Sequence, residues 1–417
     1  MIETNFKQTE VGLLPEEWEA RLVAKAFSFV GNNTCARELM SETGKVHNIH
    51  YGDILIKYGA VVNISTDNVP FLSDSVREIA KNPLQDGDVL MADTAEDETV
   101  GKCCEVIGVN NKQVETGLHS FGLRPNDKYA PKFLGYAFNS SQYHDQLLPH
   151  IQGTKVSSIS KASVGKTYLC CPKDEKEQRE IANALSDIDE LISSLNKLIE
   201  KKKSIKLAVM QQLLTGKKRI QGYSKPWEDK KISELGTLQK GNITPYLYPN
   251  EEFVEYSMPA FDEGQNPIRC KGQSMNSART MLNGKVLLVN KLNVRQKRIW
   301  LVFANTKNSV CSGEFLPFVS TKCSLEFLKQ LLLTDSIVKD WNENSSGTSN
   351  SQKRITPAYM LSYKIHIPSD VSEQIAIANV LDDMDEEIIQ LGTRKKKFEA
   401  IKQGMMQQLL SGKIRLL

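Results

Sequence analysis

Apolar positions in two segments, residues 181–213 and 377–409, follow the spacing of a long amphipathic helix. In the first segment they recur mostly in alternating steps of four and three residues, which places them on one stripe of an α-helix. The second segment repeats this spacing, but Lys395 and Lys402 interrupt its stripe. We expect these polar interruptions to weaken packing locally and to fix the register of the helix. The predicted seam consists of Ile181, Leu185, Ile188, Ile192 and Leu195 in the first segment, and of Ile377, Leu381, Met384, Ile388 and Leu391 in the second.

Both predicted helices have recognisable ends. In each copy an aspartate precedes a glutamate at the spacing of a capping box, in which each side chain caps the backbone of the other residue. A glycine then stands where a left-handed helix stop is expected. Each helix therefore runs for roughly 40 residues, or about 60 Å. The end signals are Asp174, Glu177 and Gly216 in the first copy, and Asp370, Glu373 and Gly412 in the second.

The two segments belong to an internal repeat. Residues 177–220 realign without gaps onto residues 373–416, and about half of the aligned positions are identical. A helix with one apolar stripe cannot bury that stripe alone in water, so we expect the two helices to pair. The segment between them could allow a parallel or an antiparallel pair. We favour the antiparallel pair, because a tandem duplication readily closes around a pseudo-twofold axis.

The segments before the two helices open alike and then diverge. Trp18 and Trp227 each follow a similar glycine-containing turn, and almost nothing matches between these openings and the helices. Both interiors nevertheless contain strand-like runs and an amphipathic stretch that predicts a short helix. The strand-like runs include residues 52–56, 87–91 and 284–289, and the predicted short helices cover residues 131–148 and 324–341.

These patterns predict an α+β chain with two α/β domains separated by two long helices, which pair as an antiparallel coiled coil in a pseudo-twofold internal repeat. A length of 417 residues fits two or more folded domains. Similar frames around dissimilar interiors indicate one scaffold that presents two different recognition surfaces. The predicted boundaries are residues 1–170 for the first domain, 171–221 for the first helix region, 222–366 for the second domain and 367–417 for the second helix region.

Composition narrows the class of protein only slightly. A formal charge of +3 neither supports nor excludes a polyanionic partner, and basic clusters such as 394–397 are solvated faces or binding patches. No apolar run approaches the roughly 18 residues of a membrane-spanning helix, and residues 1–5 lack signal-peptide features. We therefore expect a cytoplasmic protein with no membrane partner. The adjacent pairs Cys103–Cys104 and Cys170–Cys171 predict packing residues and no metal framework.

No catalytic motif is present. The sequence contains neither a P-loop nor a dinucleotide-binding glycine turn, and its histidines form no paired metal motif. Residues 68–71 superficially resemble the loop with which amino-methyltransferases grip a flipped base, but Val69 departs from that pattern, so we interpret them as an ordinary turn. The acidic run at residues 93–98 could bind a metal, although a solvated loop or a contact with a cytosine amino group fits better.

Four short motifs occur in the same order in both halves of the chain. They are the openings at Trp18 and Trp227, the Gly-Thr loops at 153–154 and 347–348, the helix starts at 172–178 and 368–374, and the helix ends at 211–217 and 407–413. In this order the motifs resemble the specificity subunits of type I restriction-modification systems, and the resemblance covers nearly the whole chain. It implies two target-recognition domains on double-stranded DNA, two methyltransferase subunits that carry S-adenosylmethionine and methylate adenine, and motor-nuclease restriction subunits. The chain itself would be a non-catalytic subunit without a cofactor.

If each domain reads DNA, the target is a bipartite, asymmetric site with a spacer set by the helix pair. The resemblance does not identify the residues that read bases, so we chose candidates by their chemistry. Hydroxyl, amide and cationic side chains suit phosphate and base-edge contacts, and the polar loops 153–158 and 347–354 carry several of them. The candidates are Lys57, Thr94, Asp97, Lys155, Ser157, Ser158 and Lys161 in the first domain, and Lys240, Asn242, Lys291, Asn293, Arg295, Arg298, Lys353 and Arg354 in the second.

Two other classes of function stay open at this point. A self-contained DNA methyltransferase or nuclease would bind a methyl donor or cut DNA with a metal ion, and the missing motifs argue against it. A scaffold that does not bind DNA could also be built on the coiled coil. Sequence-dependent DNA affinity that falls steeply with ionic strength would exclude the scaffold.

Overall fold

The computed structural model describes residues 5–73, 76, 82–153, 155–347, 349 and 351–416. It divides into two compact units, Met1–Asn196 with Thr393–Leu417, and Lys197–Gly392. We call them the first unit and the second unit. Each contains the start of one long helix and the end of the other. The four-part division of the chain given above stays a prediction.

The first unit is built mainly of short strands. Its five-stranded sheet has the order β4-β13-β9-β11-β7, and a four-stranded sheet has the order β12-β6-β8-β5. The strands are β1 (Phe6–Thr9), β2 (Gly12–Pro15), β3 (Trp18–Leu22), β4 (Phe27–Val30), β5 (Met40–Ser41), β6 (Val46–Ile49), β7 (Val61–Asn63), β8 (Phe71–Leu72), β9 (Val89–Ala92), β10 (Thr94–Ala95), β11 (Cys103–Ile107), β12 (Gln113–Thr116), β13 (Ser120–Pro125), β14 (Ser157–Ser158) and β15 (Tyr168–Pro172). The helices are α1 (Val23–Ala26), η1 (Arg37–Leu39), α2 (Tyr51–Ile56), α3 (Phe133–Phe138), α4 (Ser141–Leu147), η2 (Leu148–His150), α5 (Lys161–Val164) and the long helix α6 (Glu175–Leu213), which continues into the second unit.

The second unit has the same kind of architecture. A four-stranded sheet has the order β17-β25-β22-β23, and a five-stranded sheet has the order β18-β21-β24-β19-β20. The strands are β16 (Trp227–Lys231), β17 (Thr237–Leu238), β18 (Asn242–Ile243), β19 (Glu252–Tyr256), β20 (Ile268–Lys271), β21 (Arg279–Met281), β22 (Gly284–Asn290), β23 (Ile299–Ala304), β24 (Ser309–Ser312), β25 (Phe315–Val319) and β26 (Lys364–Pro368). The helices are α7 (Ile232–Leu235), η3 (Pro245–Leu247), α8 (Met258–Asp262), η4 (Gly272–Ser274), η5 (Val294–Gln296), α9 (Leu325–Leu332), α10 (Asp335–Glu343), α11 (Pro357–Ser362) and the long helix α12 (Val371–Leu409), which continues into the first unit.

One buried strand lies inside a main sheet of each unit. All four residues of β9 are buried, as are the last five residues of β22. A strand covered on both faces tolerates an unbroken apolar run, which is why these segments carry no polar alternation. Both strands were predicted from the sequence, and the polar loops 153–158 and 347–354 meet the residues that directly follow them.

A two-stranded ladder closes each unit just before its long helix. β3 pairs with β15 and places Trp18 opposite Pro172, and β16 pairs with β26 and places Trp227 opposite Pro368. The tryptophan openings and the helix starts of the repeat therefore meet in space. This ladder is the structural basis of the matching frames seen in the sequence.

Three predictions of local structure were wrong. Residues 52–56 belong to helix α2, because the His50 imidazole caps its start by accepting from the Gly52 N–H and Asp53 is buried against Arg37. The stretches 131–148 and 324–341 each form two helices instead of one. In the first of them, the Ser140 hydroxyl accepts from the Tyr143 N–H and starts the second helix, which stops the first from continuing.

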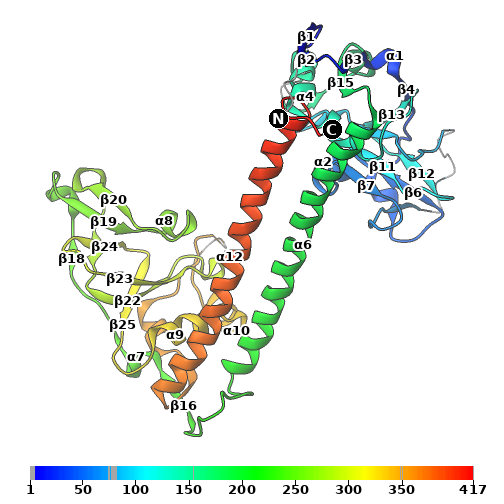
Figure 1. Ribbon diagram of the computed structural model, residues 1–417. Helices are drawn as coiled ribbons and strands as arrows, with labels where there is room; N and C mark the ends of the chain where they lie inside the picture. Colours follow the sequence, from blue (N-terminus) through cyan, green and yellow to red (C-terminus); the bar gives the residue numbers. More distant parts are fainter. Residues whose placement is uncertain are drawn as a thin grey trace. The chain divides into compact units, whose positions relative to one another are not determined.

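The two long helices pack together in antiparallel orientation, as predicted, and Figure 1 shows them side by side. In the first unit, ion pairs join Glu177 to Arg415 and Asp189 to Lys402. In the second unit, repeat-related pairs join Glu373 to Arg219 and Asp385 to Lys206. From Glu177 to Asp189 the residue number rises, whereas from Arg415 to Lys402 it falls. The ion pairs therefore show that the two helices run in opposite directions.

The helix ends agree with the sequence only in part. The carboxylates of Asp174 and Asp370 accept from the second N–H of each helix, and Gly216 and Gly412 have φ of +69°. The expected return caps from the glutamates are absent among the described contacts, because both glutamates turn to arginines instead. Arg219 binds Glu373 through two hydrogen bonds of 2.9 and 2.5 Å, and Arg415 binds Glu177 in the same two-pronged manner.

The predicted seam is buried most completely near the helix starts. Ile181 and Leu185 lie in one core with Leu409, and Ile377 and Leu381 lie in another with residues 213–214. Ile188 and Leu195 are also buried. The half-buried seam positions are Ile192, Met384, Ile388 and Leu391. The globular part of each unit therefore covers the start of its helix, and the coiled-coil assignment of each seam residue stays a prediction.

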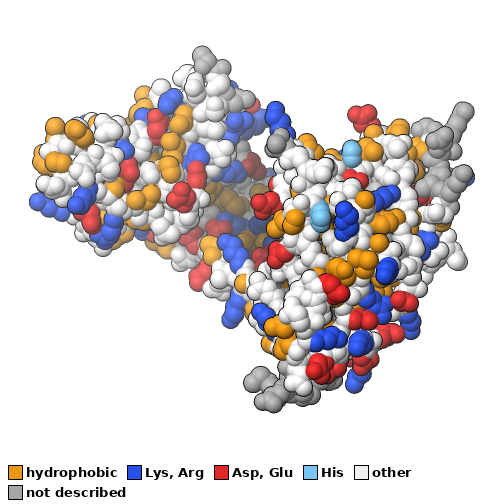
Figure 2. Space-filling model, turned by 90° about the horizontal axis from the view of Figure 1, so that it is seen from above, with side chains coloured by type: hydrophobic (Ala, Val, Ile, Leu, Met, Phe, Trp, Pro, Cys, Tyr) orange, Lys and Arg blue, Asp and Glu red, His pale blue; other side chains and the backbone are white. Residues whose placement is uncertain are grey.

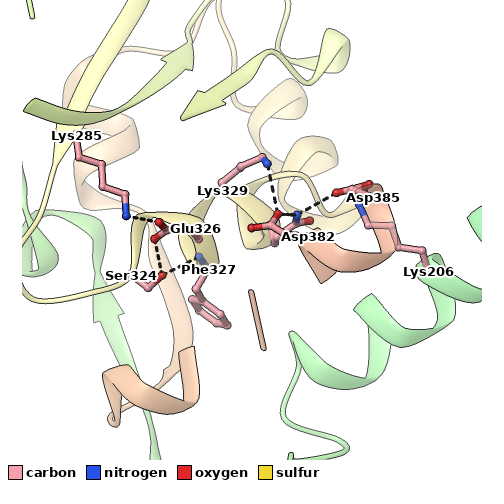
Figure 3. A network of polar contacts seen from close by, with 9 residues as sticks. Lys206, Lys285, Ser324, Glu326, Phe327, Lys329, Asp382 and Asp385 are labelled. Carbon is pink, nitrogen blue, oxygen red and sulfur yellow. Dashed lines mark hydrogen bonds and ion pairs between the residues drawn. The ribbon is translucent and has the colours of Figure 1, made fainter. Parts of the chain in front are cut away.

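A polar network ties the helix pair to the globular part of the second unit (Figure 3). Lys206 contacts the Asp385 carboxylate at 2.5 Å, and the Gln330 amide donates to both Asp385 and Asp382. Asp189 plays the same role in the first unit, where it accepts from the Tyr136 hydroxyl at 2.8 Å and pairs with Lys402 at 2.6 Å. Lys402, which was predicted to fix the register, thus has Asp189 as a defined partner.

Among the described helices, none is long and apolar enough to cross a membrane.

Candidate nucleic-acid interface

In the first unit, a polar loop docks onto the residues that follow the buried strand β9. β10 pairs with β14, so that Thr94 lies opposite Ser158, and the Ile159 N–H donates to the Asp93 carbonyl at 2.9 Å. The candidates Thr94, Ser157 and Ser158 are therefore brought together, and Lys155 precedes them on the exposed loop. We call residues 93–95 with 157–158 the first junction.

The second unit repeats this arrangement after the buried strand β22. The Asn293 N–H donates to the Lys353 carbonyl at 2.8 Å, and the Ile355 N–H donates to the Lys291 carbonyl at 3.0 Å. Leu292 and Arg354 form a bridge between these contacts. We call residues 291–293 with 353–355 the second junction, and it gathers four of the predicted candidates. Their contacts with DNA stay predictions.

Each polar loop begins with a glycine for a steric reason. Gly153 has φ of +112° and Gly347 has φ of +149°, and residues with a side chain rarely adopt these backbone angles. A Cβ at Gly153 would lie 1.9 Å from the Val156 carbonyl oxygen, and one at Gly347 would lie 2.8 Å from that of Gln352. The loop backbone folds too closely over these positions to admit a side chain. Thr154 and Thr348, the other half of each motif, lie outside the described residues.

The surface around the first junction carries hydroxyl, carboxylate and imidazole groups. The Thr94 hydroxyl donates to Asp93 at 2.8 Å, and the exposed His119 ring lies 3.7 Å from the same carboxylate. The ring of Tyr51 meets His119 edge-on at 5.4 Å. His119 has φ of +56°, an unusual backbone for this residue, and its carbonyl accepts from the Asp93 N–H. This set offers donors and acceptors that suit base edges, and no sequence pattern had pointed to His119.

The surface around the second junction is rich in cations. Arg298 binds Asp262 through two hydrogen bonds of 2.7 Å, which lower the pKa of that carboxyl. Arg354 likewise binds Glu314, and Lys297 pairs with Asp335. The cations without an ion-pair partner among the described residues are Lys291, Arg295 and Lys353. The predicted basic candidates thus fall into a neutralised group and an unpaired group.

Besides Lys155, three candidates of the first unit lie outside its junction. Lys57 donates to the Asn68 carbonyl and lines an open pocket of about 640 Å³ together with Asn68. Asp97 accepts from the hydroxyl and the N–H of Thr99, which lowers the pKa of its carboxyl. Lys161 begins α5, and its ammonium lies 5.7 Å from the ring centre of Phe121.

Besides Arg295 and Arg298, which lie next to the second junction, two candidates of the second unit are outside it. Asn242 lies in β18 and pairs with Thr280 of β21, and both strands belong to the five-stranded sheet, which does not contain β22. Lys240 lines a different open pocket, of about 600 Å³, together with Lys307 and Asn283. Sequence reasoning could not separate these positions from the junction, because strand pairing between distant segments decides which polar groups become neighbours.

The molecular surface shows no large region of a single charge on the face in Figure 2, where acidic and basic side chains alternate. In the described part of the chain, no three histidine, cysteine or carboxylate side chains are grouped to hold a metal ion, the acidic run at 93–98 included. Cys103 and Cys104 are fully buried in β11, and burial raises the pKa of the Cys104 thiol to about 12. These cysteines are packing residues, as the sequence predicted.

Comparison with known proteins relates the chain to one family. Residues 224–400 match the Type I restriction modification DNA specificity domain. The type I restriction enzyme MjaX specificity subunit of Methanocaldococcus jannaschii is 28% identical, over 99% of this chain and 97% of the relative.

Two solved structures share the fold over nearly their whole length. The S subunit of the type I restriction-modification system from M. genitalium has a TM-score of 0.59 and 14% identity, over 98% of this chain and 97% of that one. A chain from a study of complex assembly and conformational transition of the type I R-M system has a TM-score of 0.58 and 15% identity, over 96% and 99%. The matched domain, the full-length relative and the shared fold agree, and the chain is similar over nearly its whole length to type I restriction-modification specificity subunits.

Proposed function

We propose that this chain recognises a bipartite, asymmetric site on double-stranded DNA, with one half-site read by each unit through its junction. The observation that carries the proposal is the repeated construction of the two junctions. In both units a glycine-started polar loop docks after a buried strand, yet the side chains presented are different. One scaffold used twice with unlike surfaces suits a target with two unlike halves.

The chain is the non-catalytic DNA-recognition subunit of its system. We propose that it directs two methyltransferase subunits and the motor-nuclease restriction subunits to the site. S-adenosylmethionine supplies the methyl group, so it would be held by the methyltransferase subunit. This chain would bind no cofactor. The complex would act on DNA in the cytoplasm.

The proposal is tested by mapping methylated adenines at single-molecule resolution in DNA from cells with and without this chain, co-produced with a type I methyltransferase subunit from the same genome. We expect a two-part methylated motif that appears only when this chain is present. A matched strain carrying the methyltransferase alone is the control.

The alternatives give different results in the same experiment. A one-part motif, or a motif that persists without this chain, would contradict a bipartite reading by this subunit. A stable complex with the methyltransferase and no methylated motif would instead favour a scaffold that does not recognise DNA.

A further inference from the structure

The two junctions have the same construction but opposite electrostatic character. Six cationic side chains lie in or beside the second junction, within residues 291–298 and 353–354, and three of them are neutralised by carboxylates. The first junction instead contains Asp93 of the acidic run at 93–98 and presents hydroxyls, and the four carboxylates of that run outnumber the neighbouring Lys155 and Lys161. The positive charge available to an anionic ligand is therefore concentrated on the second unit's junction.

The cationic loop of the second junction is held in one conformation by several independent contacts. Asn293 and Lys297 flank the η5 turn with φ of +51° and +50°, which residues other than glycine seldom adopt. The buried Asn290 amide donates to the Leu292 carbonyl at 2.6 Å and accepts from the Leu292 N–H at 3.0 Å. Such backbone persists only where the surroundings impose it, and it clusters at ligand-binding sites. The cations are thus displayed on a rigid support.

We propose that Lys291, Arg295 and Lys353 form an anchor for the DNA phosphate backbone, so that most of the salt-dependent affinity of this chain comes from the second unit. The inference rests on the proposed DNA recognition. Phosphate contacts from lysine and arginine release condensed counterions, whereas hydroxyl and amide contacts with base edges do not. The first junction would accordingly contribute selectivity with little salt dependence.

The test measures the binding constant of the full chain for a duplex carrying the mapped motif over a series of salt concentrations. Each phosphate contact makes the slope of log K against log salt more negative by about 0.9. In the triple variant Lys291→Ala, Arg295→Ala and Lys353→Ala, the slope should be less steep by about 2 to 3. Its preference for the motif over a scrambled duplex should be retained, because phosphate contacts carry no sequence information.

A matched variant removes the same charge elsewhere in the second unit, with Lys271, Lys307 and Lys339 changed to alanine; these exposed side chains have no ion-pair partner among the described residues. Its slope should stay close to that of the unmodified chain. Equal losses of slope in both variants, or no loss in the first, would overturn the anchor. A Lys291→Arg and Lys353→Arg variant should keep the slope, which separates lost charge from damaged folding. Absence of salt-dependent binding by the unmodified chain would instead refute the proposed DNA recognition itself.

Discussion

At the scale of single residues, buried carboxylates organise the places where helices meet strands. Glu105 lies in β11 and is almost completely buried at the start of α3. Its carboxylate accepts from the backbone N–H groups of Lys132 at 2.6 Å and of Gly135 at 2.9 Å. Burial nevertheless dominates and raises the pKa of Glu105 to about 7. The folded protein therefore keeps a proton that the unfolded chain loses near pH 4.5.

This difference makes stability depend on pH through Glu105. Between pH 4.5 and 7 the folded state binds more protons than the unfolded state, so the free energy of unfolding falls as pH rises. The loss attributable to Glu105 is about 3 kcal/mol at most. Urea unfolding of the unmodified chain and of Glu105→Gln should be compared at pH 5 and pH 8. The glutamine side chain cannot ionise. The free energy of unfolding of the unmodified chain, relative to that of the variant, should therefore be lower at pH 8 than at pH 5. A difference between the two proteins that is the same at both pH values would contradict the prediction.

At the scale of elements, the helix pair depends on polar contacts related by the internal repeat. Lys206 with Asp385 and Lys402 with Asp189 are equivalent pairs, and each is mostly shielded from solvent. Each aspartate also accepts from the globular part of its unit, Asp385 from Gln330 and Asp189 from Tyr136. A shift of the helices by one turn would break both the ion pair and this second contact, so the aspartates select one register.

We expect a measurable coupling between Lys206 and Asp385. In a double-mutant cycle with Lys206→Ala and Asp385→Ala, the interaction should contribute about 1 kcal/mol to the free energy of unfolding. The matched control is Glu200 with Lys203, an exposed ion pair within α6 at 2.9 Å, where the coupling should be at most about 0.5 kcal/mol. Equal couplings in the two cycles would show that Lys206 and Asp385 have no special part in pairing the helices.

At the scale of the whole molecule, the matching frames separate the scaffold from the recognition surfaces. The β3–β15 and β16–β26 ladders and the helix ends are alike in both units, whereas the residues between them differ. Junction side chains can therefore change without altering the contacts that hold each helix start. The two recognition functions should accordingly be exchangeable one at a time.

Replacing the interior from about residue 25 to residue 152 with that of a related subunit should change one half of the methylated motif and leave the other half unchanged. Methylation mapping of cells that contain the exchanged chain gives the result directly. The corresponding exchange in the second unit should alter the opposite half. A motif that stays the same after the first exchange, or changes in both halves, would refute the assignment of one half-site to each unit.

The sequence by itself determined the α+β class, the two long helices with their ends, and the repeat that relates them. These features depend on local periodicity and on capping residues such as Asp174 and Gly216, whose physical effects act within a few positions of the chain. The pairing of the helices was also predictable, because the other copy offers the nearest complementary apolar stripe. The antiparallel orientation was favoured because a tandem duplication readily closes around a pseudo-twofold axis. The resemblance to type I specificity subunits followed from the order of short motifs, each of which is a local pattern.

The tertiary structure decided which polar side chains become neighbours. Glu177 has the spacing of a helix cap, yet it binds Arg415, which follows the end of the other helix, because antiparallel packing brings this guanidinium to a buried carboxylate. The gathering of Thr94 with Ser158, and the separation of Lys240 from Lys291, depend on strand pairing across long stretches of chain. Such pairing is set by the burial of whole sheets, so no local pattern reveals it, and the junctions became visible only in the folded chain.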